Sequence, residues 1–84
     1  MTTKQLTQPP TVVLYDVLRE ASNRLQGRLI ALEAVNTRPD ARERTIAACV
    51  AIDDRVAAVD PTDRVAIASL DAELRAELAA LPRP

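Results

Sequence analysis

The chain has 84 residues and a formal net charge of −1. It can form one small domain, and a domain of this size buries only about 60% of its unfolded surface, so its margin of stability is thin. A single cysteine and the absence of histidine exclude an intrachain disulfide and the common zinc ligand sets, while the near-zero charge gives no general attraction to nucleic acid or anionic lipid. We therefore expect a partner chain to supplement the stability of the domain.

Residues 1–10 are polar and end in two prolines, which predicts a flexible N-terminal tail ahead of a single helical domain over residues 11–84. No apolar run approaches the roughly 20 residues that span a membrane, and residues 1–10 lack the apolar segment of a signal peptide. These features predict a cytoplasmic protein. The frequent Arg, Ala and Asp are typical of a high-GC bacterium or a phage.

The first predicted helix covers residues 11–36. Thr11 can cap its start, and Gly27 falls opposite its apolar stripe, where it faces solvent or lets another backbone approach. The stripe repeats at spacings of three and four residues, as an amphipathic helix requires: Leu14, Leu18, Ala21, Leu25, Leu29 and Leu32.

The second predicted helix covers residues 38–59, with Asn36 ending the first helix and Thr37 capping the second. The short connection predicts an antiparallel hairpin. Because a helix that is apolar on several sides is usually buried, we expect this helix to be the central one of the bundle. Its first stripe is Thr45, Cys49, Ile52, Val56 and Val59, and its second stripe, roughly 90° away, is Ile46, Val50 and Ala57.

The third predicted helix covers residues 62–81, with Asp60 as its N-cap and Pro61 at its first position. Its expected core residues are Ile67, Leu70, Leu74, Leu78 and Leu81. The sequence contains no strand pattern. The predicted fold is therefore an all-α, antiparallel three-helix bundle.

The residues that usually carry catalysis are scarce. Without histidine the common general base near neutral pH is missing, and neither Ser22 nor Ser69 has an evident activating base. Cys49 lies in an apolar stripe, where a thiol behaves as a small buried hydrophobe. We expect no catalytic residue, no cofactor and no metal site.

Asp53 and Asp54 are adjacent, so on a helix their carboxylates point about 100° apart and cannot easily share one metal ion. Asp53 lies between the two apolar stripes and is predicted to be a structural polar residue. A half-buried carboxylate needs a hydrogen-bond donor. The expected partners are Ser22 or Arg24 of the first helix, or Ser69 of the third.

The first two helices carry a strip of arginines that could contact phosphates or another anion: Arg24, Arg28, Arg38 and Arg42. Acidic residues are interleaved with them, and no aromatic residue accompanies them for base stacking. Contact with nucleic acid is therefore an alternative interpretation of this strip.

A second candidate surface is a ridge of alanines on the back of the second helix, Ala47, Ala51 and Ala58. Arg44, Asp54 and Arg55 flank it with charge, as in an interface with a polar rim. We predict a homodimer through this ridge. Val12, Val13 and Ile30 of the first helix are the next surface to consider.

Residues 18–36, LREASNRLQGRLIALEAVN, resemble the first helix of the all-α chorismate mutases, through Leu18, Arg19, Leu25, Leu29 and Leu32. That resemblance implies a dimeric three-helix enzyme that holds an anionic substrate with a lysine and arginines. This chain has no lysine after Lys4, and Val35-Asn36 stand where that family would place a basic residue.

The residues thus favour a non-enzymatic protein–protein interaction module, such as an adaptor, regulator or inhibitor, that self-associates and binds a further protein. The alternative is a nucleic-acid-contacting regulator or antitoxin-like protein that uses the arginine strip. A chorismate-mutase-like enzyme is the third interpretation.

Overall fold

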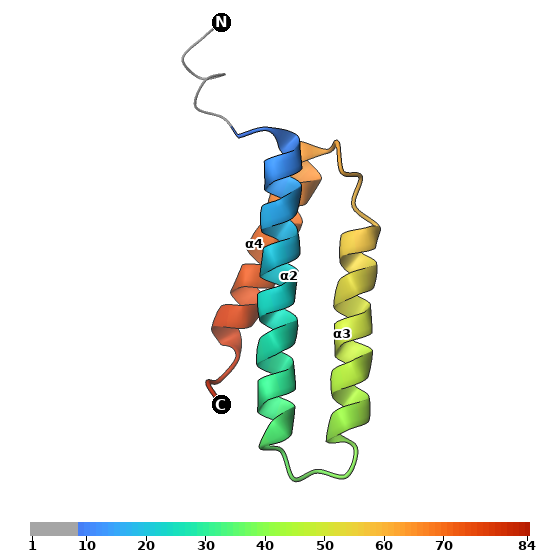
Figure 1. Cartoon of the computed structure of the whole chain (residues 1–84), viewed down its shortest axis with the longest axis vertical. Coiled ribbons are helices and arrows are strands. Elements are labelled where there is room, and N and C mark those ends of the chain that lie inside the picture. Colours follow the sequence, from blue (N-terminus) through green and yellow to red (C-terminus); the bar gives the residue numbers. More distant parts are fainter. Residues whose placement is uncertain (1–8) are drawn as a thin grey trace, which may run out of the picture.

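The computed structural model describes residues 9–84, so most of the predicted tail lies outside the described residues. Within residues 9–84, three helices follow one another up and down the bundle: α2 (Thr11–Ala34), α3 (Ala41–Ala57) and α4 (Arg64–Ala80). Figure 1 shows α2 and α4 running in the same direction, with α3 antiparallel to both. Residues 9–84 contain no strand. The predicted all-α three-helix bundle is confirmed.

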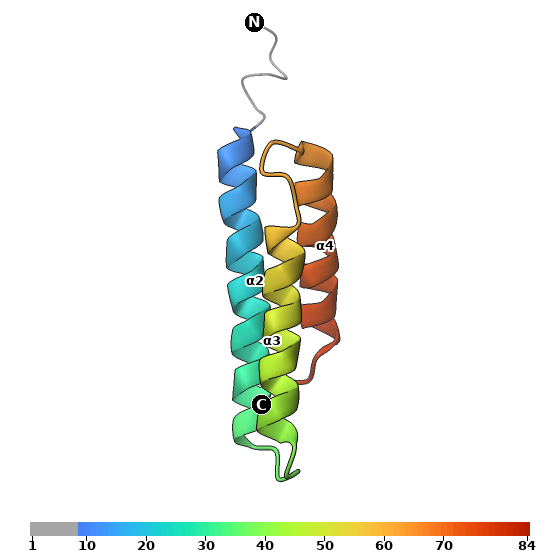
Figure 2. The same ribbon diagram turned by 90° about the vertical axis from the view of Figure 1, so that its right-hand side faces the viewer.

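The central helix is α2. It packs against both α3 and α4, whereas α3 and α4 contact each other only weakly. In Figure 1, α3 lies to the right of α2 and most of α4 lies behind α2 and to its left. Figure 2 shows the same bundle turned by 90°. The prediction that the second helix is central was therefore wrong. Leucines line the inner faces of α2 and α4, whereas α3 contributes only Ile52 and Val56 to the buried cluster, so α2 and α4 bury more large apolar side chains by packing together.

The core follows the two leucine stripes. Leu18, Ile67 and Leu74 are the largest fully buried side chains, and Leu25 is only 2% exposed. From α3 the core receives Ile52 and Val56. Four further leucines of the predicted stripes pack partly buried around this cluster: Leu14, Leu29, Leu78 and Leu81.

The hairpin connection is longer than predicted, because Asn36 starts a turn. Its side-chain Oδ1 accepts a hydrogen bond from the backbone N–H of Arg38 at 2.9 Å. Such local bonds compete with helix formation. α3 accordingly begins at Ala41, with Asp40 rather than Thr37 at the N-cap and no side-chain capping bond.

A similar turn shortens α4 at its start. The Asp60 Oδ1 accepts hydrogen bonds from both the backbone N–H and the hydroxyl of Thr62, at 2.9 and 2.7 Å. These bonds lower the pKa of Asp60. The N-cap of α4 is instead Asp63, which accepts from the Ala66 N–H at 3.0 Å. The prediction of Asp60 as the cap was wrong by three residues.

At the first helix the predicted cap is also displaced. Pro10 precedes α2, and Thr11 is its first helical residue. The Thr11 hydroxyl accepts a hydrogen bond from Arg64 at 3.1 Å instead of capping its own helix. Arg64 also donates to the Pro9 carbonyl at 2.9 Å, so one arginine ties the starts of α2 and α4 together.

Candidate interaction surface

The outer face of the α2–α3 hairpin carries exposed aliphatic side chains. Ile46 and Val50, one turn apart on α3, are 54% and 51% exposed, and Ile30 of α2 is 55% exposed. Ile46 and Val50 belong to the second apolar stripe of α3, for which burial was expected. Ile30 lies on the neighbouring helix α2. Because α3 lies at the side of the bundle, only its first stripe reaches the core. The expectation that this helix is buried on several sides was therefore wrong.

A hollow of about 290 Å³ lies between the two helices on this face. Its walls come from α2 and α3 alone: Ile30, Glu33, Arg42, Thr45 and Ile46. Ile30 of α2 and Ile46 of α3 therefore line the same hollow from the two helices of the hairpin. Glu33 and Arg42 supply one charge of each sign beside them. The combination is an apolar centre with a polar border, as in protein interfaces.

The predicted alanine ridge is placed differently. Ala47, Ala51 and Ala58 are exposed, as an outward ridge would be. Ala51, however, lines a groove of about 410 Å³ between α3 and α4, whose floor includes Leu25 and Leu29 of α2. The ridge thus borders the third helix on one side instead of standing free on the back of α3.

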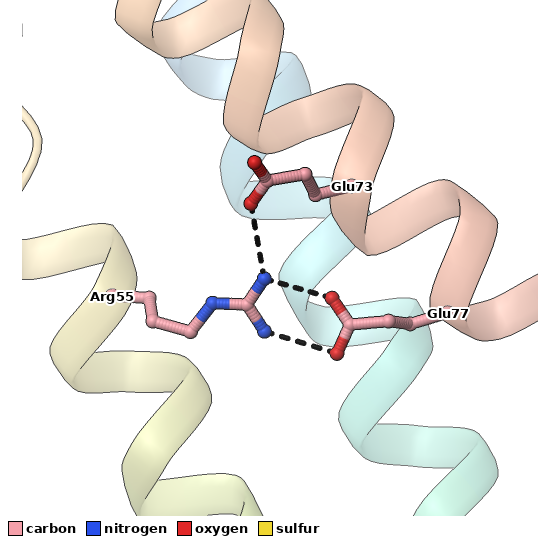
Figure 3. A network of polar contacts seen from close by, with 3 residues as sticks. All are labelled: Arg55, Glu73 and Glu77. Atoms are coloured by element: carbon pink, nitrogen blue, oxygen red, sulfur yellow. Dashed lines mark hydrogen bonds and ion pairs between the residues drawn. The ribbon is translucent and has the colours of Figure 1, made fainter.

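Arg55, predicted as a rim residue of the interface, instead bridges α3 to α4 (Figure 3). Its two terminal nitrogens meet the two carboxylate oxygens of Glu77 at 3.0 and 2.8 Å. The Arg55 nitrogen that lies 2.8 Å from Glu77 also contacts a Glu73 carboxylate oxygen at 3.3 Å. Hydrogen bonding to Arg55 lowers the pKa of Glu77, and the same bonds raise the pKa of Arg55. We call this cluster the Arg55 clamp.

Asp53 bonds to the first helix, but its partner there is a residue outside the expected set. The side-chain amide of Gln26 donates to the Asp53 Oδ1 at 2.7 Å and approaches the Ser22 hydroxyl at 3.0 Å. Asp53 is exposed. Of the three expected partners, Arg24 pairs with Glu20 on its own helix.

The four arginines of the predicted anion strip do not act as one group. Arg24 pairs with Glu20, and Arg28 donates to the Pro82 carbonyl at 3.4 Å. Arg38 lies 3.6 Å from the Asp40 carboxylate in the hairpin connection, and Arg42 lines the hollow on the outer face. Acidic or carbonyl oxygens thus already engage three of the four side chains, which weakens the case for a phosphate-binding strip.

Cys49 has the environment of a structural thiol. It is partly buried, and burial raises its pKa, with the negative charge of Asp53 raising it further. Both effects disfavour the thiolate, which is the nucleophilic form. Within residues 9–84 no group of three or more His, Cys, Asp or Glu side chains is arranged to hold a metal ion.

Sequence reasoning missed the Arg55 clamp and the role of Gln26. Glu73 and Glu77 lie one turn apart on one face of α4, which is a signal for a cation on a neighbouring helix. Assigning that cation to Arg55 requires knowing which side of α3 faces α4. Periodicity alone does not give this.

Comparison with known proteins gave no match: no family model, no curated protein and no solved structure matches the chain. No helix among the described residues is both long enough and apolar enough to cross a membrane.

Proposed function

We propose that this protein is a non-enzymatic helical interaction module, which self-associates in the cytoplasm and acts by binding other protein surfaces. The observation that carries the proposal is the exposed aliphatic face of the α2–α3 hairpin, where Ile30, Ile46 and Val50 are each more than half exposed. A small chain with thin stability gains by covering such a face.

The chemistry of the remaining side chains supports a binding role over a catalytic one. The Cys49 thiol is held in its protonated form by burial and by Asp53. The most highly connected charged cluster, the Arg55 clamp, joins two helices of the same chain. Glu77 borders the apolar groove between α3 and α4, but its hydrogen bonds to Arg55 lower its pKa, which makes it a weak general base and a poor general acid near neutral pH.

The proposal is tested by light scattering coupled to size exclusion at micromolar concentration. We expect a species of at least twice the 9.1 kDa chain mass. A monomer that persists as the concentration is raised would contradict self-association. A parallel gel-shift assay with DNA and RNA serves as a control, because salt-dependent binding there would favour the nucleic-acid alternative.

A further inference from the structure

We infer that two copies of this chain pair through the outer face of the α2–α3 hairpin, around a two-fold axis that runs along the hairpin between the two helices. This inference rests on the proposed self-association and adds which surface is used and how the copies are oriented. It replaces the alanine ridge as the interface. The central features are Ile30, Ile46, Val50, Glu33 and Arg42.

The arrangement of the helices sets the symmetry. α2 and α3 are antiparallel neighbours, and the residues that line the hollow on this face come from both of them at one level. A two-fold axis lying along that hollow places α2 of one copy over α3 of the second copy while keeping every residue at its own level. Each helix then has an antiparallel neighbour in the other copy, which is the packing of four-helix bundles.

The apolar residues match under this symmetry. Ile30 of one copy meets Ile46 of the second, and the reverse contact forms at the other side of the axis. Val50, one turn along α3, extends the apolar strip beyond the hollow. These three side chains are each more than half exposed in the single chain. The pairing therefore removes from water the aliphatic surface that α4 leaves uncovered.

The charges argue for a second copy as the occupant. Glu33 lies on the α2 side of the hollow and Arg42 on the α3 side. Neither makes an ion pair with any of residues 9–84. The two-fold axis brings Glu33 of each copy to Arg42 of the other, so the surface is complementary to itself. A nucleic acid would instead meet Glu33 with its phosphates.

The test uses two charge reversals, Glu33→Arg and Arg42→Glu, in the full chain. Each variant alone places like charges together on both sides of the two-fold axis, so we expect its dimer dissociation constant to rise by roughly tenfold. Mixing the two variants gives a heterodimer in which both pairs are again opposite in sign. With an affinity tag on one variant, we expect the untagged variant to co-purify. The dissociation constant of the mixed dimer should return to that of the unsubstituted parent chain.

The controls establish whether the dimer forms through this surface or through another part of the chain. Circular dichroism shows whether each variant keeps its helices. Ile46→Glu should give a monomer, whereas Ala51→Glu, the same kind of change on the alanine ridge of α3, should leave the dimer intact. The mixing step excludes an effect within one chain, because a contact between Glu33 and Arg42 of the same copy could not be restored by a second variant.

Several results would overturn the inference. If the parent dimerises and the single reversals dimerise equally well, or if Ala51→Glu abolishes the dimer, the interface lies elsewhere and only this inference fails. A mixture that stays monomeric would also contradict the pairing of Glu33 with Arg42. If the parent itself is a monomer, the proposed self-association fails together with this surface.

Discussion

Gly27 lies inside α2 with no conformational need for glycine. Its backbone torsion is not in the left-handed region, and a Cβ added there would meet no atom within 4 Å. Of the two roles expected for this glycine, exposure to solvent fits the single chain. A glycine in the interior of a helix is less favourable than alanine by about 1 kcal/mol.

We therefore predict that Gly27→Ala raises the free energy of unfolding by about 0.5–1 kcal/mol. Chemical denaturation followed by circular dichroism measures the change. A destabilised variant would mean that another backbone comes close to this position, for instance in an assembly.

Leu25 connects the core of the bundle with the groove between α3 and α4. It is 2% exposed and belongs to the buried cluster, and its side chain also lines the groove. Leu25→Ala should lower the free energy of unfolding by about 2–5 kcal/mol, because it removes buried methyl groups and leaves a cavity.

The matched control for Leu25→Ala is Val65→Ala on α4, whose parent side chain is 79% exposed. It should change stability by less than about 0.5 kcal/mol. An unchanged denaturation midpoint in Leu25→Ala would remove Leu25 from the core.

At the scale of elements, the Arg55 clamp adds a polar link between α3 and α4 to the apolar cluster that they share. The pKa of Glu77 is lowered, so the carboxylate is favoured in the folded state. Stability from this group is present above the ordinary glutamate pKa of about 4.3 and is lost as the pH falls through the lower folded-state value. Because both partners are partly exposed, the contribution is about 0.2–1 kcal/mol.

We predict that Glu77→Gln lowers the free energy of unfolding at pH 7 and that this difference from the parent disappears at strongly acidic pH. Denaturant titrations across the acid range provide the measurement. Glu20→Gln, which removes a pair within α2 alone, is the control and should have a smaller effect at pH 7. If the parent and Glu77→Gln differ equally at all pH values, the clamp does not act through the charge of Glu77.

The three helices and their inner faces could be predicted because each inner face repeats with helical spacing. Leu18 and Leu25 of α2 and Leu70 and Leu74 of α4 are buried where that spacing puts them. The helix ends were less accurate, since Asn36 and Asp60 form local turns whose bonds compete with capping. The sequence of α3 did not show which helix is central. Two apolar stripes are expected both for a central helix and for an outer helix that leaves one apolar face exposed.

For the whole molecule, the proposed self-association couples assembly to stability. If dimers form from folded chains, binding stabilises the folded state by mass action, and the melting temperature depends on protein concentration. We predict that the melting temperature rises as the chain concentration increases from low micromolar to high micromolar. The Ile46→Glu variant should lose this dependence, while a parent whose melting temperature is constant over that range would argue against association of folded chains.

The close packing of α2 on α4 has a consequence for how the chain folds. These two helices form the larger contact of the bundle, yet the whole of residues 35–63 separates them in sequence. The chain must bring the two ends of residues 35–63 together before most of the leucines can meet. The entropy cost of closing this segment therefore slows folding. α2 and α3, although adjacent in sequence, bury few large side chains together. During synthesis, therefore, the hydrophobic core remains incomplete until α4 has been made.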